Sequence, residues 1–383
     1  MTAVLFGTFN SRHAANVLLA EELRSSGAEL RICHEPLWEE TRDKQDSYFA
    51  ISGLLVLGLR WILAAFRLAL RFRYAAAGAE VIVVGFNGQL DVLLARLLAG
   101  GRQVVFAPLV TVSETLVEDR GVYAPDSLPA RMFQELDRWT LMAADIVVID
   151  TQAHADYLVA ELGVPADRIR VHYLGAESAF APEATPTSRP LEWQPGPRLR
   201  VLAYSSYLPL HGMDVVAAAA AELRPEEGIA FLIVGSGPER ERVESEFRGL
   251  PHVTLEDWMP QEELVGQLRA SDVALGIFGT SAKAHMVIPN KIYQAVQTGC
   301  PVVTLDTPAI REIFVPGESL MAIASSSDAL VATLRRMAEE PAMGRQMART
   351  AAAEVRVSAG PQVRAQRWRQ TLSFGSAEAP TPA

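Results

Sequence analysis

Residues 287–312, VIPNKIYQAVQTGCPVVTLDTPAIRE, predict a helix, a short buried strand and a second helix in close succession. Pro289 and Asn290 suit the first turn of a helix, and Gly299 with the proline two residues later marks its end. Residues 302–305 are apolar and short enough for a buried strand. Near the start of the sequence, residues 3–33 read as strand, loop, helix and strand, which is the start of a doubly wound α/β domain.

Lys291 is unusual in this stretch because the positive end of a helix dipole repels a cation unless an anion binds there. Gln294 lies three residues further on and so shares the same helical face. A cation and an amide on one face, beside the carboxyl end of a strand, suit a ligand with phosphates and hydroxyls. The alternative is a solvated lysine and glutamine on an ordinary surface helix.

The pattern Pro-Asn-Lys-x-x-Gln-Ala, followed by Thr-Gly-x-Pro-Val-Val, resembles the nucleotide-sugar-binding segment of family-4 (group 1) retaining glycosyltransferases. That family has the GT-B fold, and its segment carries two glutamates separated by seven residues. Met286 and Gln294 occupy those two positions here. The resemblance implies that Gln294 binds the donor ribose through its amide, without the charge assistance of a carboxylate.

The resemblance further implies an α/β protein with two Rossmann-like doubly wound domains facing a cleft, which the length of 383 residues accommodates. We expect an acceptor-side domain over residues 1–180 and a nucleotide-sugar-binding domain over 199–360. Residues 181–198, rich in Pro, Thr, Ser and Glu, read as the linker. A last helix at 361–373 is expected to cross back to the first domain, and 374–383 to form a disordered tail.

The second domain is expected to bind the donor through loops that follow its strands. Ser206 and His211 stand where the family has an arginine and a lysine that bind the donor diphosphate. Lys291 and Lys283 are the predicted catalytic cations, acting with the Gly235–Gly237 backbone on the leaving diphosphate. The predicted donor-binding set is Ser206, His211, Gly235, Gly237, Pro289, Asn290, Lys291, Gln294 and Thr307.

The first domain offers two polar loops after predicted strands, at the edge of the sheet that binds ligands in α/β proteins. One loop holds Asn10, Arg12 and His13, which either contact a ligand or only cap the following helix. The other spans residues 108–120 and holds no histidine. From these loops we predict acceptor-side residues Asn10, Arg12, His13, Ser113 and Arg120, and two further catalytic candidates, Glu114 and Asp119.

Residues 49–74 form a long apolar segment that Arg60, Arg67, Arg71 and Arg73 interrupt. A central arginine disfavours a membrane span. The arginine spacing instead allows an interfacial helix on anionic lipid, or a core helix with one arginine row in water. The sequence leaves both interpretations open.

Composition excludes several classes of protein. A net charge of −10 argues against a nucleic-acid partner. Cys33 and Cys300 give neither a disulfide framework nor a metal-ligand spacing, which suits a reducing cytoplasm. We expect no metal, because no Asp-x-Asp element is present, and no cofactor. The start of the sequence resembles no secretory signal. The expected location is the cytoplasm, with possible peripheral association at the inner face of the membrane.

The sequence thus predicts a metal-independent hexosyltransferase that retains anomeric configuration and uses a nucleotide diphosphate sugar. Its acceptor would be a small molecule, a polysaccharide or a lipid-linked precursor of the cell envelope. A catalytically lapsed sugar-nucleotide-binding or scaffolding partner is one alternative, and a sugar-nucleotide epimerase of the same fold is another.

Overall fold

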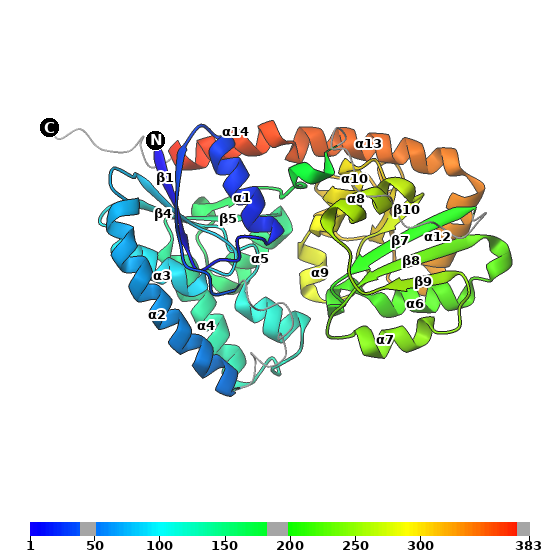
Figure 1. Cartoon of the computed structure of the whole chain (residues 1–383), viewed down its shortest axis with the longest axis horizontal. Helices are drawn as coiled ribbons and strands as arrows, with labels where there is room; N and C mark the ends of the chain where they lie inside the picture. The colour runs from blue at the N-terminus through cyan, green and yellow to red at the C-terminus, as the bar shows by residue number, and fades with distance from the viewer. Residues whose placement is uncertain (39–50, 182–197, 374–383) are drawn as a thin grey trace. The chain divides into compact units, whose positions relative to one another are not determined.

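A computed structural model describes residues 1–38, 51–181 and 198–373, and divides the chain into two compact units (Figure 1). The first unit contains Met1–Leu174 and the C-terminal segment from Ala359, and the second contains Gly175–Ser358. The unit boundary therefore precedes residue 180, because residues 175–180 pack with the second unit. The expected linker and tail lie almost wholly outside the described residues.

The first unit is a six-stranded parallel sheet in the order β2-β1-β3-β4-β5-β6. Every neighbouring pair runs parallel, as in the register Thr2↔Glu29 between β1 and β2. Its elements are β1 (Thr2–Gly7), α1 (Ala14–Ser25), β2 (Glu29–His34), α2 (Ile51–Ala75), β3 (Val81–Val84), α3 (Gln89–Leu98), β4 (Gln103–Phe106), η2 (Glu114–Asp119), α4 (Leu128–Ala143), β5 (Ile146–Ile149), α5 (Gln152–Leu162), η3 (Ala166–Arg168), β6 (Ile169–Val171) and α14 (Pro361–Ser373).

Helices cover both faces of this sheet because its strands β1, β3, β4 and β5 are apolar and buried on both sides. One core contains side chains from α2, α3, α4 and α5, such as Leu68 of α2 and Leu141 of α4. The core on the opposite face contains Leu23 of α1 and Trp368 of α14. The C-terminal helix α14 is thus part of the first unit, where the Trp368 indole donates to Glu22 at 2.7 Å.

The second unit repeats the architecture with the order β12-β11-β10-β7-β8-β9, again all parallel. Its elements are η4 (Ser178–Phe180), β7 (Leu199–Ser205), η5 (Pro209–His211), α6 (Met213–Glu222), η6 (Pro225–Glu227), β8 (Ile229–Gly235), α7 (Arg240–Phe247), β9 (Val253–Glu256), α8 (Gln261–Ala270), β10 (Val273–Leu275), α9 (Ala282–Met286), α10 (Asn290–Gln297), β11 (Val302–Leu305), α11 (Pro308–Arg311), β12 (Met321–Ile323), α12 (Ser327–Glu339) and α13 (Pro341–Ala359).

The predicted helix, strand and helix at residues 287–312 are α10, β11 and α11, and the doubly wound α/β class is confirmed. The apolar segment at 49–74 lies mostly in α2, with its first two residues outside the described part of the chain. Within the described ranges, no helix is both long enough and apolar enough to cross a membrane.

Candidate donor-binding and acceptor-side sites

Lys291 lies in the first turn of α10, and its amine points at the carboxyl ends of two strands. Nζ donates to the backbone oxygen of Tyr204 on β7 at 2.7 Å, and it lies 3.4 Å from that of Gly276, which follows β10. The amine also lies 5.6 Å from the centre of the Tyr204 ring. Burial lowers the pKa of Lys291 to about 7. The structure thus holds a desolvated amine at the edge of the sheet where α/β proteins bind ligands.

Gln294 lies one turn further along α10, in a chain of hydrogen bonds within the second unit. The Tyr204 hydroxyl shares its one proton between the Lys291 backbone oxygen at 2.9 Å and Gln294 Oε1 at 3.1 Å. The orientation of the Gln294 amide follows from its other contact, because a carboxylate can only accept. Gln294 Nε2 then donates to the Glu177 carboxylate at 2.9 and 3.2 Å, and Asn290 Nδ2 donates to the same group at 3.3 Å. Glu177 is 8% exposed. A carboxylate therefore lies beside Gln294, although the chain has no glutamate at position 294 itself.

His211 ends the short helix η5 and is almost fully buried. His211 Nδ1 lies 3.4 Å from the Leu208 backbone nitrogen and 2.8 Å from the Ser205 hydroxyl, and it accepts because the Leu208 N–H can only donate. An accepting Nδ1 leaves the ring proton on Nε2, which has no hydrogen-bond partner among the residues described. Burial, helped by the charges of Lys291 and Lys283, holds the pKa of His211 well below its usual range. His211 is thus a neutral N–H donor.

Gly235 and Gly237 bring the turn after β8 against the loop after β7. A Cβ at Gly235 would lie 1.9 Å from the Ser205 carbonyl oxygen, and one at Gly237 would lie 1.7 Å from that of Ser206. Gly235 also has φ +132°, which disfavours any other residue. The Ser206 side chain is exposed. The two loops can only be this close because both turn positions are glycine.

The remaining predicted donor residues have structural roles in this unit. Pro289 precedes the first residue of α10, and Thr307 is 2% exposed and caps α11 by accepting from the Ile310 N–H at 3.1 Å. Lys283, the second predicted catalytic cation, is buried on α9, and its charge helps to lower the pKa of His211. The Thr307 hydroxyl accepts the capping N–H and keeps its own O–H as a donor, so its predicted contact with the donor stays a prediction.

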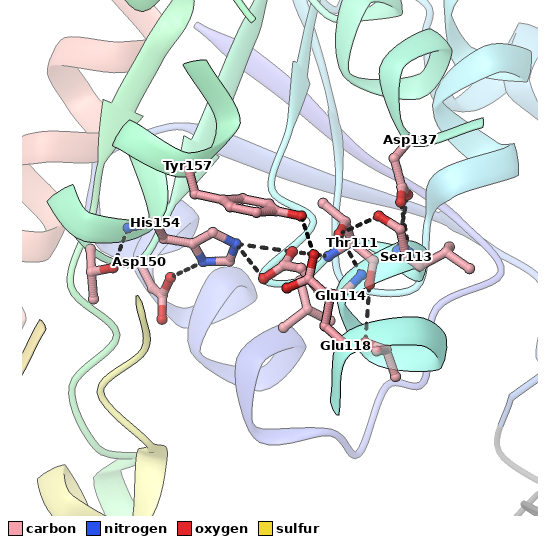
Figure 2. Close-up of polar contacts among 12 residues, drawn as sticks. Thr111, Ser113, Glu114, Glu118, Asp137, Asp150, His154 and Tyr157 are labelled. Carbon is pink, nitrogen blue, oxygen red and sulfur yellow. Dashed lines mark hydrogen bonds and ion pairs between the residues drawn. The ribbon is translucent and has the colours of Figure 1, made fainter. Parts of the chain in front are cut away.

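The first unit contains a buried charged triad at the carboxyl ends of β4 and β5 (Figure 2). His154 of α5 lies between Asp150, 2.9 Å from Nδ1, and Glu114 of η2, 3.0 Å from Nε2. His154 and Glu114 are completely buried. Burial alone would lower the pKa of His154, but the two carboxylates raise it to about 10. The triad is thus an imidazolium held between two carboxylates.

Further acidic groups surround this triad. Asp137 of α4 accepts from the backbone N–H groups of Val112 and Ser113 at 2.9 and 2.7 Å, and burial raises its pKa to about 6. The Tyr157 hydroxyl donates to Glu118 at 2.8 Å (Figure 2). The loop after β4 is therefore anchored to α4 and α5 by polar contacts, in addition to the buried side chains of Leu116 and Val117.

The structure places both catalytic candidates of this loop inside the unit. Glu114 is bound by His154 and by the Thr111 N–H at 2.8 Å, and Asp119 is 5% exposed. Ser113 is 6% exposed, and Arg120 follows η2. A carboxylate with no exposed surface positions other groups in this conformation, and direct contact of Glu114 or Asp119 with a substrate stays a prediction.

The loop after β1 carries the other acceptor-side candidates. Asn10 accepts from the Arg12 N–H at 2.9 Å, and the Arg12 side chain is exposed. His13 caps α1 and stacks on Phe86, with ring centres 4.3 Å apart. Burial lowers the pKa of His13 to about 4, so this ring is neutral at neutral pH. The loop is built by local capping, and Arg12 is its exposed charge.

The prediction from sequence did not include three residues of these sites, namely His154, Glu177 and Tyr204. His154 was detectable, because Asp150 and His154 are four apart at a helix start and so share a face. Glu177 meets Gln294 across 117 positions of sequence, which no local pattern reveals. In the described part of the chain, no cluster of His, Cys, Asp or Glu side chains is arranged to hold a metal ion.

Several solved structures superpose on almost the whole of this chain. Sucrose-phosphate synthase from Thermosynechococcus elongatus superposes with a TM-score of 0.71 at 16% identity, covering 98% of this chain and 99% of that chain. HepE from Anabaena in complex with UDP gives 0.68 at 14%, covering 97% and 100%, and a glycosyltransferase from Rickettsia africae gives 0.66 at 11%, covering 99% of both chains. The fold is the GT-B fold.

Two family models match consecutive parts of the sequence. "Glycosyl transferase 4-like domain" matches residues 14–175, and "Glycosyl transferases group 1" matches residues 198–340. The chain belongs to the group 1 glycosyltransferases and is a transferase enzyme. No curated protein matches the sequence.

Proposed function

We propose that this enzyme transfers a hexose, with retention, from a nucleotide diphosphate sugar bound by the second unit. The observation that carries the proposal is the desolvated amine of Lys291, held at the carboxyl ends of β7 and β10. The pKa of this buried amine is about 7, and an anion bound beside the amine would stabilise its charged form. The UDP and UDP-glucose in the Anabaena HepE structures support a donor of this class.

The diphosphate of the donor would be bound by the amine of Lys291, the Nε2–H of His211 and the backbone around Gly237. Lys283 adds a second positive charge nearby. Two cations balance most of the charge of a diphosphate leaving group, so we propose that transfer needs no metal. The neutral His211 would act as a hydrogen-bond donor, in place of the cation that the family has there.

The ribose would be bound beside Gln294, where the Glu177 carboxylate supplies the negative charge that the glutamine lacks. Glu177 is held by two amides, so its oxygens are preoriented. A carboxylate accepts hydrogen bonds from ribose hydroxyls more strongly than a neutral amide. We therefore assign Glu177 and Gln294 together to the ribose.

The acceptor would be bound by the first unit, with Asn10, Arg12 and His13 as candidate contacts. We propose that the acceptor is a glycan, a lipid-linked precursor or a small molecule, in polysaccharide or cell-envelope synthesis. The His154 triad would fix the loop that carries Ser113 and Arg120, because it ties η2 to α5.

A thermal-shift screen tests the donor site. UDP, GDP, ADP and dTDP, with their common sugars, are added to the wild type, to Lys291→Ala and to the matched control Arg349→Ala, an exposed cation of the same unit. One nucleotide should stabilise the wild type and Arg349→Ala, by about 2.7 kcal/mol at 100 times its dissociation constant, and fail to stabilise Lys291→Ala.

Two results would count against this assignment. If no nucleotide stabilises the wild type, the chain is a lapsed member of the family and its role is scaffolding. If a nucleotide stabilises Lys291→Ala as well as the wild type, the donor binds elsewhere. A sugar-nucleotide epimerase would instead convert its donor to another sugar nucleotide without releasing the nucleotide.

A further inference from the structure

Helix α2 has apolar residues on two opposite sides. One side packs on the sheet through Ala64, Leu68 and Phe72, which are 0–6% exposed. The other side presents a continuous apolar row whose members are 54–85% exposed: Val56, Leu59, Ile62, Leu63, Phe66, Leu70 and Tyr74. At about 100° per residue, the centres of the two sides lie roughly 170° apart around the helix. The second side is thus not explained by the core of the unit.

Three arginines form a row along one flank of the exposed side. Arg60, Arg67 and Arg71 lie within about 40° of each other, between the exposed and the buried sides. Arg71 forms an ion pair with the buried carboxylate of Glu35, and Arg67 lies 3.7 Å from the same group. Both arginine side chains are nevertheless more than 60% exposed. Residues 51–75 contain four arginines and no acidic residue, in a chain with net charge −10.

Helix α4 lies in the same layer as α2, since both pack on one face of the sheet (Figure 1). Its outer side is also partly apolar, with 45–72% exposure at Leu128, Met132, Trp139 and Met142. These residues repeat at helical spacing and so form a second row. An exposed apolar area of this extent is typical of an interaction surface.

We infer that the outer side of α2 docks on the surface of an anionic lipid bilayer, with the apolar row inserted among the acyl chains. The arginine row would then lie at the depth of the lipid phosphates, which is how interfacial helices bind. Charge complementarity favours lipid over a second copy of the chain. In a symmetric dimer the arginine row would face itself, and α2 has no acidic residue to pair with it.

A bilayer surface also restricts the acceptor. An enzyme held at the membrane by its acceptor-side unit reaches substrates anchored in that membrane, so the inference favours the lipid-linked acceptor among the three classes proposed above. This last step rests on the proposed transferase activity, whereas the docking itself does not.

Flotation with vesicles tests the docking. The wild type is mixed with vesicles of phosphatidylcholine alone or of phosphatidylcholine with phosphatidylglycerol, at low and at high salt. Two variants are compared: Leu63→Gln/Phe66→Gln/Leu70→Gln on α2, and the matched control Val315→Gln/Val357→Gln, exposed apolar residues of the other unit. All five positions are exposed, so both proteins should fold, which thermal unfolding checks.

We expect the wild type and the control to float with vesicles that contain phosphatidylglycerol. Binding should be weaker at high salt, and weaker to vesicles of phosphatidylcholine alone. The triple variant should bind at least about tenfold more weakly, because three inserted side chains are lost. Arg60→Gln/Arg73→Gln removes one arginine of the row and the fourth arginine of the helix, which lies on the exposed side itself. This variant should weaken binding to anionic vesicles only, and it leaves the contacts with Glu35 in place.

Two results overturn the inference: a wild type that stays unbound with anionic vesicles, or a triple variant that floats as well as the control. In the first case, light scattering at increasing protein concentration shows whether α2 is instead an interface between copies, which the triple variant would then disrupt. Nucleotide thermal shifts with the triple variant should be unchanged, so a failure of docking and a failure of the donor site are distinguishable.

Discussion

A single buried amine connects stability and ligand binding in the second unit. Lys291 has lost most of its hydration, which lowers its pKa to about 7, and its nearest partners are neutral carbonyl oxygens. Without an anion, this position costs the folded protein free energy. A residue that is unfavourable in the free protein and favourable in a complex is what a phosphate-binding site requires.

Lys291→Met should therefore stabilise the unliganded protein by about 1 kcal/mol or more at pH 7 and weaken nucleotide binding about 10- to 100-fold. The direction of the pH dependence of stability follows because the pKa of Lys291 is lower in the folded protein than in the unfolded one. Between about pH 7 and 10.5 the unfolded wild type binds more protons, so wild-type stability rises with pH relative to the variant. Denaturant unfolding of both proteins across this range measures the difference, and a variant less stable than the wild type at pH 7 would refute it.

The His154 triad makes the opposite prediction. Its folded pKa of about 10 lies above the unfolded value of about 6.5, so its contribution is complete below pH 6.5 and is lost as pH rises through 10. Glu114→Gln removes one carboxylate and should lower the free energy of unfolding by about 3–5 kcal/mol near neutral pH. The deficit relative to the wild type should shrink toward pH 10. A constant deficit would mean that His154 is neutral in the folded protein.

Single residues show where sequence reasoning succeeds and fails. The odd position of Lys291 was visible, because a cation in a first helical turn conflicts with the dipole. Thr307 precedes Pro308, a spacing that also predicts a helix cap, and the structure has that cap; its assignment to the donor stays a prediction. Glu177 could not be found, since its contact with Gln294 depends on the tertiary fold.

At the scale of elements, loops at the carboxyl ends of strands form the donor site. The turn after β8 and the loop after β7 touch through glycine positions, so their backbones are closer than side chains would allow. In the first unit, the π-helical turn η2 is held by Asp137 and His154 instead. Strand ends and helix starts follow from local sequence, whereas the packing of one loop on another does not.

Gly237→Ala tests the contact between these loops. A Cβ there would lie 1.7 Å from the Ser206 oxygen, so the backbone has to move. We expect a loss of about 1–3 kcal/mol in stability and weaker nucleotide binding. Gly58→Ala is the control, because its Cβ would meet nothing within 4 Å and alanine favours the helix. Calorimetry on both variants gives the answer, and an unaffected Gly237→Ala would show that the turn is mobile enough to adapt.

At the scale of the whole molecule, the chain is two α/β units of one architecture, and the C-terminal helix belongs to the first. Hydrophobic strands, helix caps and the segment at residues 287–312 predicted this class, because each is a local signal repeated along the chain. The composition of residues 49–74 did not show whether this segment is a core helix or an interfacial helix. Only the structure separates its buried side from its exposed side.

The central claim is that the second unit activates a nucleotide sugar through Lys291. Release of nucleotide from the donor that the binding screen selects, measured without acceptor, tests this most directly. We predict slow hydrolysis by the wild type, a sugar product that keeps its anomeric configuration in the first NMR spectra, and a rate about 100-fold lower for Lys291→Met. A wild type that binds this donor but never releases nucleotide, or a Lys291→Met variant as fast as the wild type, would contradict the account.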